Sequence, residues 1–142
     1  MRYTVDASVI ARWLIRGERW EEEAERLMED YMEGRVELYA PSLILYECLN
    51  ALWKSLRIGV MEREEALQIS RELPKFLPET LNLTAQDVER IMELSIRLGL
   101  TCYDCSYIAV SMKTGTPLIT ADEELYRKAG EVISTLHIKD YH

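Results

Sequence analysis

The apolar residues follow two different repeats along the chain, and these repeats alternate. Alternating apolar and polar positions predict a short strand at Tyr3 to Val5, and helical spacing from Val9 to Leu14 then predicts a helix that ends by Gly17. Both repeats recur toward the C-terminus. Further strands are predicted at residues 36–39, 76–83, 118–120 and 131–138, and further helices at residues 20–34, 43–56, 62–73, 84–99, 104–113 and 121–129.

Strands separated by helical segments indicate an α/β protein with a mainly parallel sheet, covered by helices on both faces. Because the chain has 142 residues and neither a Gly/Ser linker nor an internal repeat, we expect one domain over residues 1–142. Binding sites in such sheets lie beyond the carboxyl ends of the strands. Asp6 and Asp122 each stand just after a predicted strand, which places both at that edge.

Three of the predicted helices have apolar faces that bear on packing. Residues 104–113 are apolar nearly all round, which predicts a buried helix. The helix at residues 43–56 has one apolar face, which should point inward and consists of Leu43, Tyr46, Leu49, Leu52, Trp53 and Leu56. The helix at residues 84–99 has one apolar face as well, formed by Val88, Ile91, Met92, Ser95 and Ile96. Trp13, Trp20 and Trp53 can serve core packing or a partner or dimer surface, and we expect core packing.

The composition is that of a soluble globular protein, with 48% hydrophobic and 30% charged residues. Asp6, Arg12 and Arg16 interrupt the apolar run that a signal peptide needs, and no apolar stretch approaches the ~20 residues that cross a bilayer. Three cysteines are an odd number, which argues against a disulfide framework. We therefore expect a cytoplasmic protein without a membrane segment.

The formal net charge of -8 counts against nucleic-acid binding, because phosphate contacts usually require a basic face. Bound metal ions offset this objection, since they reverse the local sign of the field around their carboxylate ligands. Arg12, Arg16 and Arg19 lie close together and are candidates for contact with substrate phosphate. A solvated helix face is the competing interpretation.

Four acids interrupt or directly abut apolar stretches, where an unpaired charge is costly to bury. Asp6 follows the first strand, Glu47 lies inside an apolar helix, Asp104 begins the buried helix and Asp122 precedes the last helix. Glu47 has no capping role, so it needs a cation, either a basic side chain or a metal ion. Asn50 lies one turn later on the same helix face.

Helix capping can explain some of these acids without any catalytic role. Asp is a favoured N-cap residue, and Asp122 fits that role. Thr120 and Glu123 also match the spacing of a capping box. Asp6 and Ser8 can together cap the first helix. Both interpretations stay open for these residues.

Convergence of all four acids at one sheet edge is unfavourable unless a cation neutralises them. Oxygen ligands suit Mg²⁺ or Mn²⁺, whereas zinc would call for His or Cys. Two such ions can activate water and stabilise the leaving oxygen in phosphodiester hydrolysis, so no protein nucleophile is required. Ser8 and Thr120 would then orient a carboxylate.

Four stretches resemble the motifs of the PIN domain family, in the family's order. They are Tyr3 to Ser8 (YTVDAS), Pro41 to Asn50 (PSLILYECLN), Tyr103 to Tyr107 (YDCSY) and Leu118 to Asp122 (LITAD). In particular, they resemble the VapC-type toxins of prokaryotes, which cut RNA with Mg²⁺ or Mn²⁺ and are silenced by a small antitoxin. The resemblance implies a three-layer α/β/α domain with about five strands, commonly as a homodimer.

Carried over residue by residue, the resemblance also implies the site. It makes Asp6, Glu47, Asp104 and Asp122 the catalytic and metal-binding residues, with Ser8, Asn50 and Thr120 as supporting positions. The implied activity is that of an endoribonuclease, the toxin of a type II toxin-antitoxin pair. An antitoxin would mask the pocket by placing a basic side chain among the carboxylates.

Cys105 departs from the family's pattern, in which a small residue such as alanine usually stands at this position. It creates a Cys102-x-x-Cys105 pair, so a redox or zinc role must be considered. No second pair accompanies it, and only His137 and His142 could add imidazole ligands, so we do not expect this role.

Other functions fit parts of the pattern. A non-catalytic binding module of the same fold would use the acidic pocket for a basic partner segment, and a nuclease of RNA processing would have no antitoxin. Stabilisation by a metal ion would separate the binding module from a nuclease. An aspartate-nucleophile phosphatase also places an acid after the first strand, but its usual second Asp is replaced here by Ser8.

Overall fold

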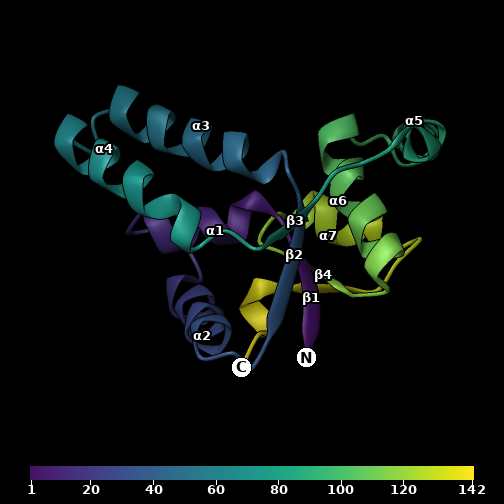
Figure 1. Ribbon diagram of the computed structural model, residues 1–142, viewed down its shortest axis with the longest axis horizontal. Coiled ribbons are helices and arrows are strands. Elements are labelled where there is room, and N and C mark those ends of the chain that lie inside the picture. Colours follow the sequence, from purple (N-terminus) through teal and green to yellow (C-terminus); the bar gives the residue numbers. More distant parts are fainter.

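Five parallel strands form the centre of the structure (Figure 1). The computed structural model describes residues 1–142. The strands are β1 (Arg2–Val5), β2 (Glu37–Pro41), β3 (Glu79–Leu81), β4 (Leu118–Thr120) and β5 (Thr135–His137). They lie in the order β3-β2-β1-β4-β5, and every neighbouring pair is parallel. The expected parallel sheet of about five strands is confirmed.

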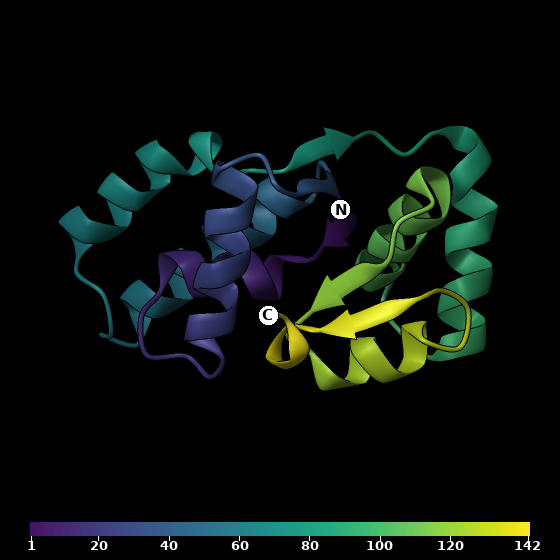
Figure 2. The same cartoon turned by 90° about the horizontal axis from the view of Figure 1, so that it is seen from below.

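Helices cover both faces of this sheet. They are α1 (Ala7–Leu14), α2 (Glu21–Met32), α3 (Ile44–Arg57), α4 (Arg63–Glu72), α5 (Ala85–Leu98), α6 (Cys102–Thr114) and α7 (Glu123–Ala129), with short 3-10 turns at η1 (Leu73–Lys75) and η2 (Ile138–Asp140). Figure 2 shows α1 to α4 on one side of the sheet and α5 and α6 on the other, which is the expected three-layer arrangement. None of the helices has both the length and the hydrophobicity needed to span a membrane.

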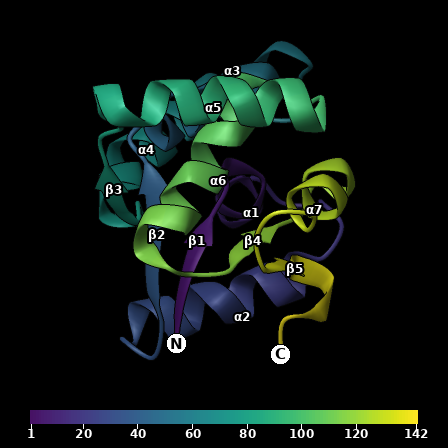
Figure 3. The same cartoon turned by 90° about the vertical axis from the view of Figure 1, so that its right-hand side faces the viewer.

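Helix α6 is the buried helix expected from the sequence. Every residue from Cys105 to Ser111 is buried, because α6 packs against β1 and β2 and is itself covered by α5. Figure 3 shows α5 lying across it. Thr101 caps the helix by accepting a hydrogen bond from the Asp104 amide at 3.1 Å.

The inward face expected for α3 is wrong at three positions. Tyr46 is 69% exposed, Trp53 is 51% exposed, and Leu49 is also exposed. The positions that the core buries are instead Ile44, Cys48, Leu52 and Ser55. The apolar pattern of this helix is wider than the stripe that its neighbours cover, so periodicity alone could not select the buried stripe.

Helix α5 also leaves apolar side chains in solvent. Val88, Met92 and Ile96, from the apolar face expected in the sequence, are all exposed. Trp13 and Trp20 are partly buried against the core, as expected, and only Trp53 departs from that expectation. Two helices, α3 and α5, therefore carry uncovered apolar faces.

The C-terminal strand is shorter than expected, because the chain before it closes a turn onto the end of α7. The amides of Glu131 and Val132 donate to the carbonyl oxygens of Lys128 and Ala129 at 3.1 and 3.0 Å. These donors are therefore not available to a strand, and β5 holds only residues 135–137.

The strands β1 and β4 end side by side at the centre of the sheet, with Val5 opposite Ile119. From β1 the chain passes through α1 and α2 to β2, whereas from β4 it passes through α7 to β5 on the opposite side. This reversal of direction is a topological switch point, where open parallel sheets bind ligands. Asp6 and Asp122 follow these two strands.

Candidate active site

Asp6 lies at the switch point and is buried, with 6% of its surface exposed. Its two oxygens accept hydrogen bonds from the hydroxyls of Ser8 (2.6 Å) and Thr120 (3.0 Å). Although Asp6 precedes α1, its side chain makes no capping bond to that helix. The pKa of Asp6 is raised to about 7, chiefly by burial and to a smaller extent by the nearby carboxylates of Asp122 and Asp104, against the lowering effect of the two hydroxyls.

The two hydroxyls that bind Asp6 also fix the chain after β4. Ser8 Oγ accepts from the Ala121 amide and Thr120 Oγ1 accepts from the Asp122 amide, each at 3.0 Å. A hydroxyl has a single proton to donate, and here both protons are directed at Asp6. Ser8 and Thr120 thus hold the Asp6 carboxylate in one orientation, and their supporting role in catalysis stays a prediction.

Asp122 caps α7, since its Oδ1 accepts from the Leu125 amide at 2.8 Å. The capping interpretation is therefore correct for this residue. The capping box of Thr120 and Glu123 does not form, because the Thr120 hydroxyl is bound to Asp6 instead. Asp122 remains exposed, and its charge still acts on Asp6 and Asp104.

Glu47 has a neutral partner in place of the cation that its position in the sequence suggested. The phenol of Tyr107 donates to Glu47 Oε1 at 2.6 Å, and no Lys or Arg forms an ion pair with Glu47. Burial raises the pKa of Tyr107 far above its usual range, so the phenol remains a donor. Reasoning from the sequence missed Tyr107. Its spacing of three residues from Asp104 on one helix face was the available signal.

Asp104 lies in the first turn of α6 and is partly buried. Burial is the largest cause of its raised pKa, and the charges of Asp122 and Glu47 add to it. Like the other three acids, Asp104 has no ion pair with a Lys or Arg side chain. The four carboxylates therefore come from four segments of the chain, none has a basic partner, and each acts electrostatically on at least one of the others.

The expected convergence of all four side chains is not found as a single metal-binding cluster. No group of three or more His, Cys, Asp or Glu residues lies close enough to hold one metal ion. The donor set nevertheless fits Mg²⁺ or Mn²⁺, because it consists of carboxylate oxygens and Mg²⁺ usually takes only one or two protein carboxylates, with water in its other positions. The raised pKa of Asp6 is a second sign of fit, since a divalent cation relieves the cost of its buried charge.

The two arginines expected near substrate phosphate are both engaged within the chain. Arg12 donates to the carbonyl oxygens of Arg19 and Ser8, each at 2.7 Å. Arg16 forms ion pairs with Glu21 and Glu25. The structure thus favours the solvated helix face over phosphate contact, particularly for Arg16.

Asn50 is exposed on α3 and lines a cavity of about 600 Å³ together with Ser8 and Glu47. The cavity makes these polar groups accessible to a ligand. Cys102 and Cys105 are free thiols, and both accept from the Ser95 hydroxyl. Burial raises the pKa of the Cys105 thiol, which disfavours the thiolate that redox or zinc chemistry requires.

Two relatives from Pyrobaculum aerophilum match nearly the whole chain. Ribonuclease VapC3 is 34% identical over 129 residues, which are 90% of this chain and 95% of the relative. Exonuclease VapC9 is 31% identical over 128 residues, which are 90% of this chain and 86% of the relative.

Solved structures share the fold. PAE2754 from Pyrobaculum aerophilum superposes with a TM-score of 0.70 at 28% identity, covering 98% of this chain and 90% of that one. VapBC2 from Rickettsia felis, bound to a DNA fragment from their promoter, gives 0.68 at 13% identity and coverages of 96% and 98%. The family model described as the PIN domain matches residues 3–131. The resemblance seen in the four sequence motifs is thereby confirmed, and the chain belongs to the PIN domain family.

Proposed function

We propose that the protein is an endoribonuclease that hydrolyses RNA phosphodiester bonds with Mg²⁺ or Mn²⁺. The observation that carries this proposal is the buried carboxylate of Asp6, which lies at the switch point beside Asp104 and Asp122 with no basic side chain to neutralise it. The similarity to Ribonuclease VapC3 supports RNA as the substrate. Since another relative is named an exonuclease, the test must also establish whether RNA is cut internally or from one end.

Each polar residue of the site has a role in this proposal. A bound Mg²⁺ or Mn²⁺ supplies the charge that activates water and stabilises the leaving oxygen. Asp6 and Asp104 would hold the metal, and Asp122 and Glu47 would act on it through its bound waters. Ser8 and Thr120 keep the Asp6 carboxylate in one orientation through their hydroxyl bonds. Asn50 is exposed beside Glu47 and is available to the substrate.

Cleavage assays on defined substrates test this function. Incubation with tRNA, rRNA fragments and single-stranded DNA, with and without Mn²⁺, should give internal cuts in RNA that stop when a chelator is added. Asp6→Asn and Asp104→Asn should each lower the rate by at least about 100-fold while remaining folded. Asp140→Asn is the matched control, because Asp140 is exposed and lies outside the site. Undiminished cleavage by both site variants would refute the assignment.

We further propose that the protein is the toxin of a toxin-antitoxin pair. The resemblance to VapC-type toxins supports this, and so does a groove of about 440 Å³ between α3 and α4, which is suited to an apolar partner segment. Leu49, Trp53 and Leu67 line it and are exposed. A basic side chain of the partner would enter the carboxylate site and compete with metal. An antitoxin complex that still bound Mn²⁺ and cleaved RNA at the free rate would exclude this mode of inhibition.

A homodimer is the third part of the proposal. The exposed apolar side chains of Val88, Met92 and Ile96 lie on one face of α5. Apolar faces of this kind are uncommon on monomeric proteins and are typical of interfaces. A second copy of the chain would cover this face.

A further inference from the structure

The cavity beside the carboxylates has walls that the proposed hydrolysis does not use. They come from α1, α3 and α6, and the lining residues without a role in the hydrolysis include Tyr46, Lys54 and Tyr103. The volume of about 600 Å³ lies within the range of about 300 to 1,000 Å³ that is usual for ligand pockets. Because Ser8 and Glu47 line it as well, the cavity is continuous with the carboxylate site.

Two aromatic side chains are exposed at this cavity. Tyr46 of α3 is 69% exposed and Tyr103 of α6 is 64% exposed, so neither ring is required by the core. A flat aromatic face in solvent can stack against a nucleobase, whatever the identity of the base. The bases of a duplex are already stacked and paired, so only an unpaired nucleotide can use such a face.

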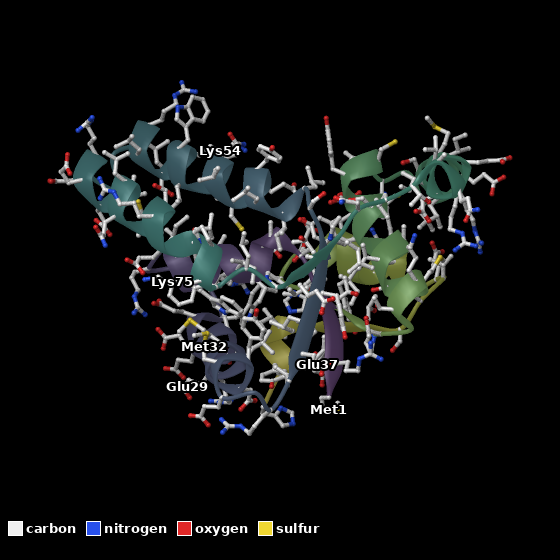
Figure 4. The ribbon with its side chains drawn as sticks, viewed as in Figure 1. Met1, Glu29, Met32, Glu37, Lys54 and Lys75 are labelled. Atoms are coloured by element: carbon white, nitrogen blue, oxygen red, sulfur yellow. The ribbon has the colours of Figure 1, made fainter.

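Lys54 is the only cationic side chain that lines the cavity. It forms no ion pair and is exposed, whereas the neighbouring Arg57 stacks on Trp53 at 4.9 Å from the ring centroid. Lys54 lies seven residues after Glu47 on α3, which places it about 10 Å farther along the helix axis. A free cation at that distance from the acids is positioned to contact a phosphate adjacent to the one being cleaved. Figure 4 shows Lys54 beside α3, and Lys75 well away from it beyond α4.

We propose that this cavity seats one unstacked nucleotide of single-stranded RNA beside the scissile phosphate. Its base lies against Tyr46 and Tyr103, and Lys54 contacts its phosphate. This assignment rests on the proposed ribonuclease function and adds the three side chains that would contact an unpaired nucleotide. Exposed aromatic faces and an unpaired cation are the features of a single-strand binding site, and their position next to the acids favours a nucleotide over a protein segment.

Binding of RNA by the full-length protein tests the proposal without requiring turnover. The probe is a fluorescently labelled single-stranded oligoribonucleotide, whose anisotropy is measured in an Asp104→Asn background so that it is not cleaved. Tyr46→Ala and Tyr103→Ala should each weaken binding about tenfold, whereas Tyr46→Phe and Tyr103→Phe should not. Lys54→Ala should weaken binding and reduce its salt dependence. Lys75→Ala is the matched control, since Lys75 is exposed and lies outside the cavity, and it should bind as the parent does.

The outcomes separate this inference from the function on which it rests. If wild-type protein cleaves RNA but the tyrosine and lysine variants bind it as the parent does, the nucleotide seat is refuted and the nuclease stands. If wild-type protein cleaves nothing, the nuclease fails, and tyrosine-dependent binding of single strands would still support the seat. Absence of RNA binding, or equal affinity for a duplex of the same sequence, would overturn it.

Discussion

The phenol of Tyr107 on α6 donates a 2.6 Å hydrogen bond to Glu47 on α3, which joins helices from opposite sides of the sheet (Figure 2). Tyr107 is 2% exposed, so packing holds its ring, and therefore its hydroxyl group, in one position. Glu47 makes no other side-chain hydrogen bond or ion pair, so this bond is what orients its carboxylate. Tyr107 therefore acts as a positioning residue for a candidate metal ligand.

Removal of this hydroxyl should lower activity more than stability. We expect Tyr107→Phe to reduce kcat/KM for RNA about tenfold or more, as is typical when a group that orients a metal ligand is lost. The free energy of unfolding should fall by about 1 kcal/mol, the usual value of one hydrogen bond. Tyr31→Phe is the control, since it loses a comparable bond of 2.8 Å to the Leu77 carbonyl far from the site. Equal rates for the two variants would show that Tyr107 has no positioning role.

The raised pKa of Asp6 predicts how the stability of the metal-free protein depends on pH. The folded-state pKa of about 7 exceeds the ordinary value of 3.8, so the folded state binds the proton more tightly. The free energy of unfolding should therefore decrease as the pH rises from about 4 to about 7, by up to about 4 kcal/mol for this one group.

Asp6→Asn removes the buried charge and isolates this effect. In chelator, the variant should be more stable than wild type at pH 8 and should have no advantage at pH 4, as measured by urea unfolding at each pH. The gain at pH 8 should be smaller than the full effect of the charge, because the neutral amide accepts from only one of the two hydroxyls. A variant that is less stable than wild type at pH 8 would contradict the burial of an unneutralised carboxylate.

The apolar face of α5 predicts a self-association that one charge can prevent. Met92 is 52% exposed in the middle of that face. Met92→Glu should convert the protein from dimer to monomer in light scattering, with little change in the unfolding temperature of the monomer, because the side chain is not part of the core. Glu93→Gln is the control on the same helix. If wild-type protein is itself monomeric at high concentration, α5 is not the dimer surface.

Much of the fold follows from features that act locally in the sequence. The buried helix was correctly located because the residues after Asp104 are apolar on every side, and only a position between two layers accommodates such a helix. The end of β1 was correctly located because Asp6 interrupts an apolar run. Register and strand order depend on contacts between distant segments, which no local pattern encodes.

The side chains whose surroundings differ from the expected ones share a physical cause. Tyr46 and Trp53 were expected inside because they are apolar, yet they are exposed because neighbouring helices cover only part of α3. Tyr107 was missed for the converse reason. It is a core aromatic residue whose single polar atom happens to meet Glu47, and only the tertiary packing of α6 against the sheet brings the two residues together.

Thermal unfolding in the presence of Mn²⁺ tests most directly the claim that these carboxylates form a metal site. At a Mn²⁺ concentration about 100 times Kd, binding should stabilise wild-type protein by about 2.7 kcal/mol, which corresponds to a Tm increase of about 5 to 10 °C. Asp104→Asn should lose most of this increase, and the exposed control Asp140→Asn should keep it. A wild-type Tm that does not respond to Mn²⁺, or an equal increase in Asp104→Asn, would contradict the account.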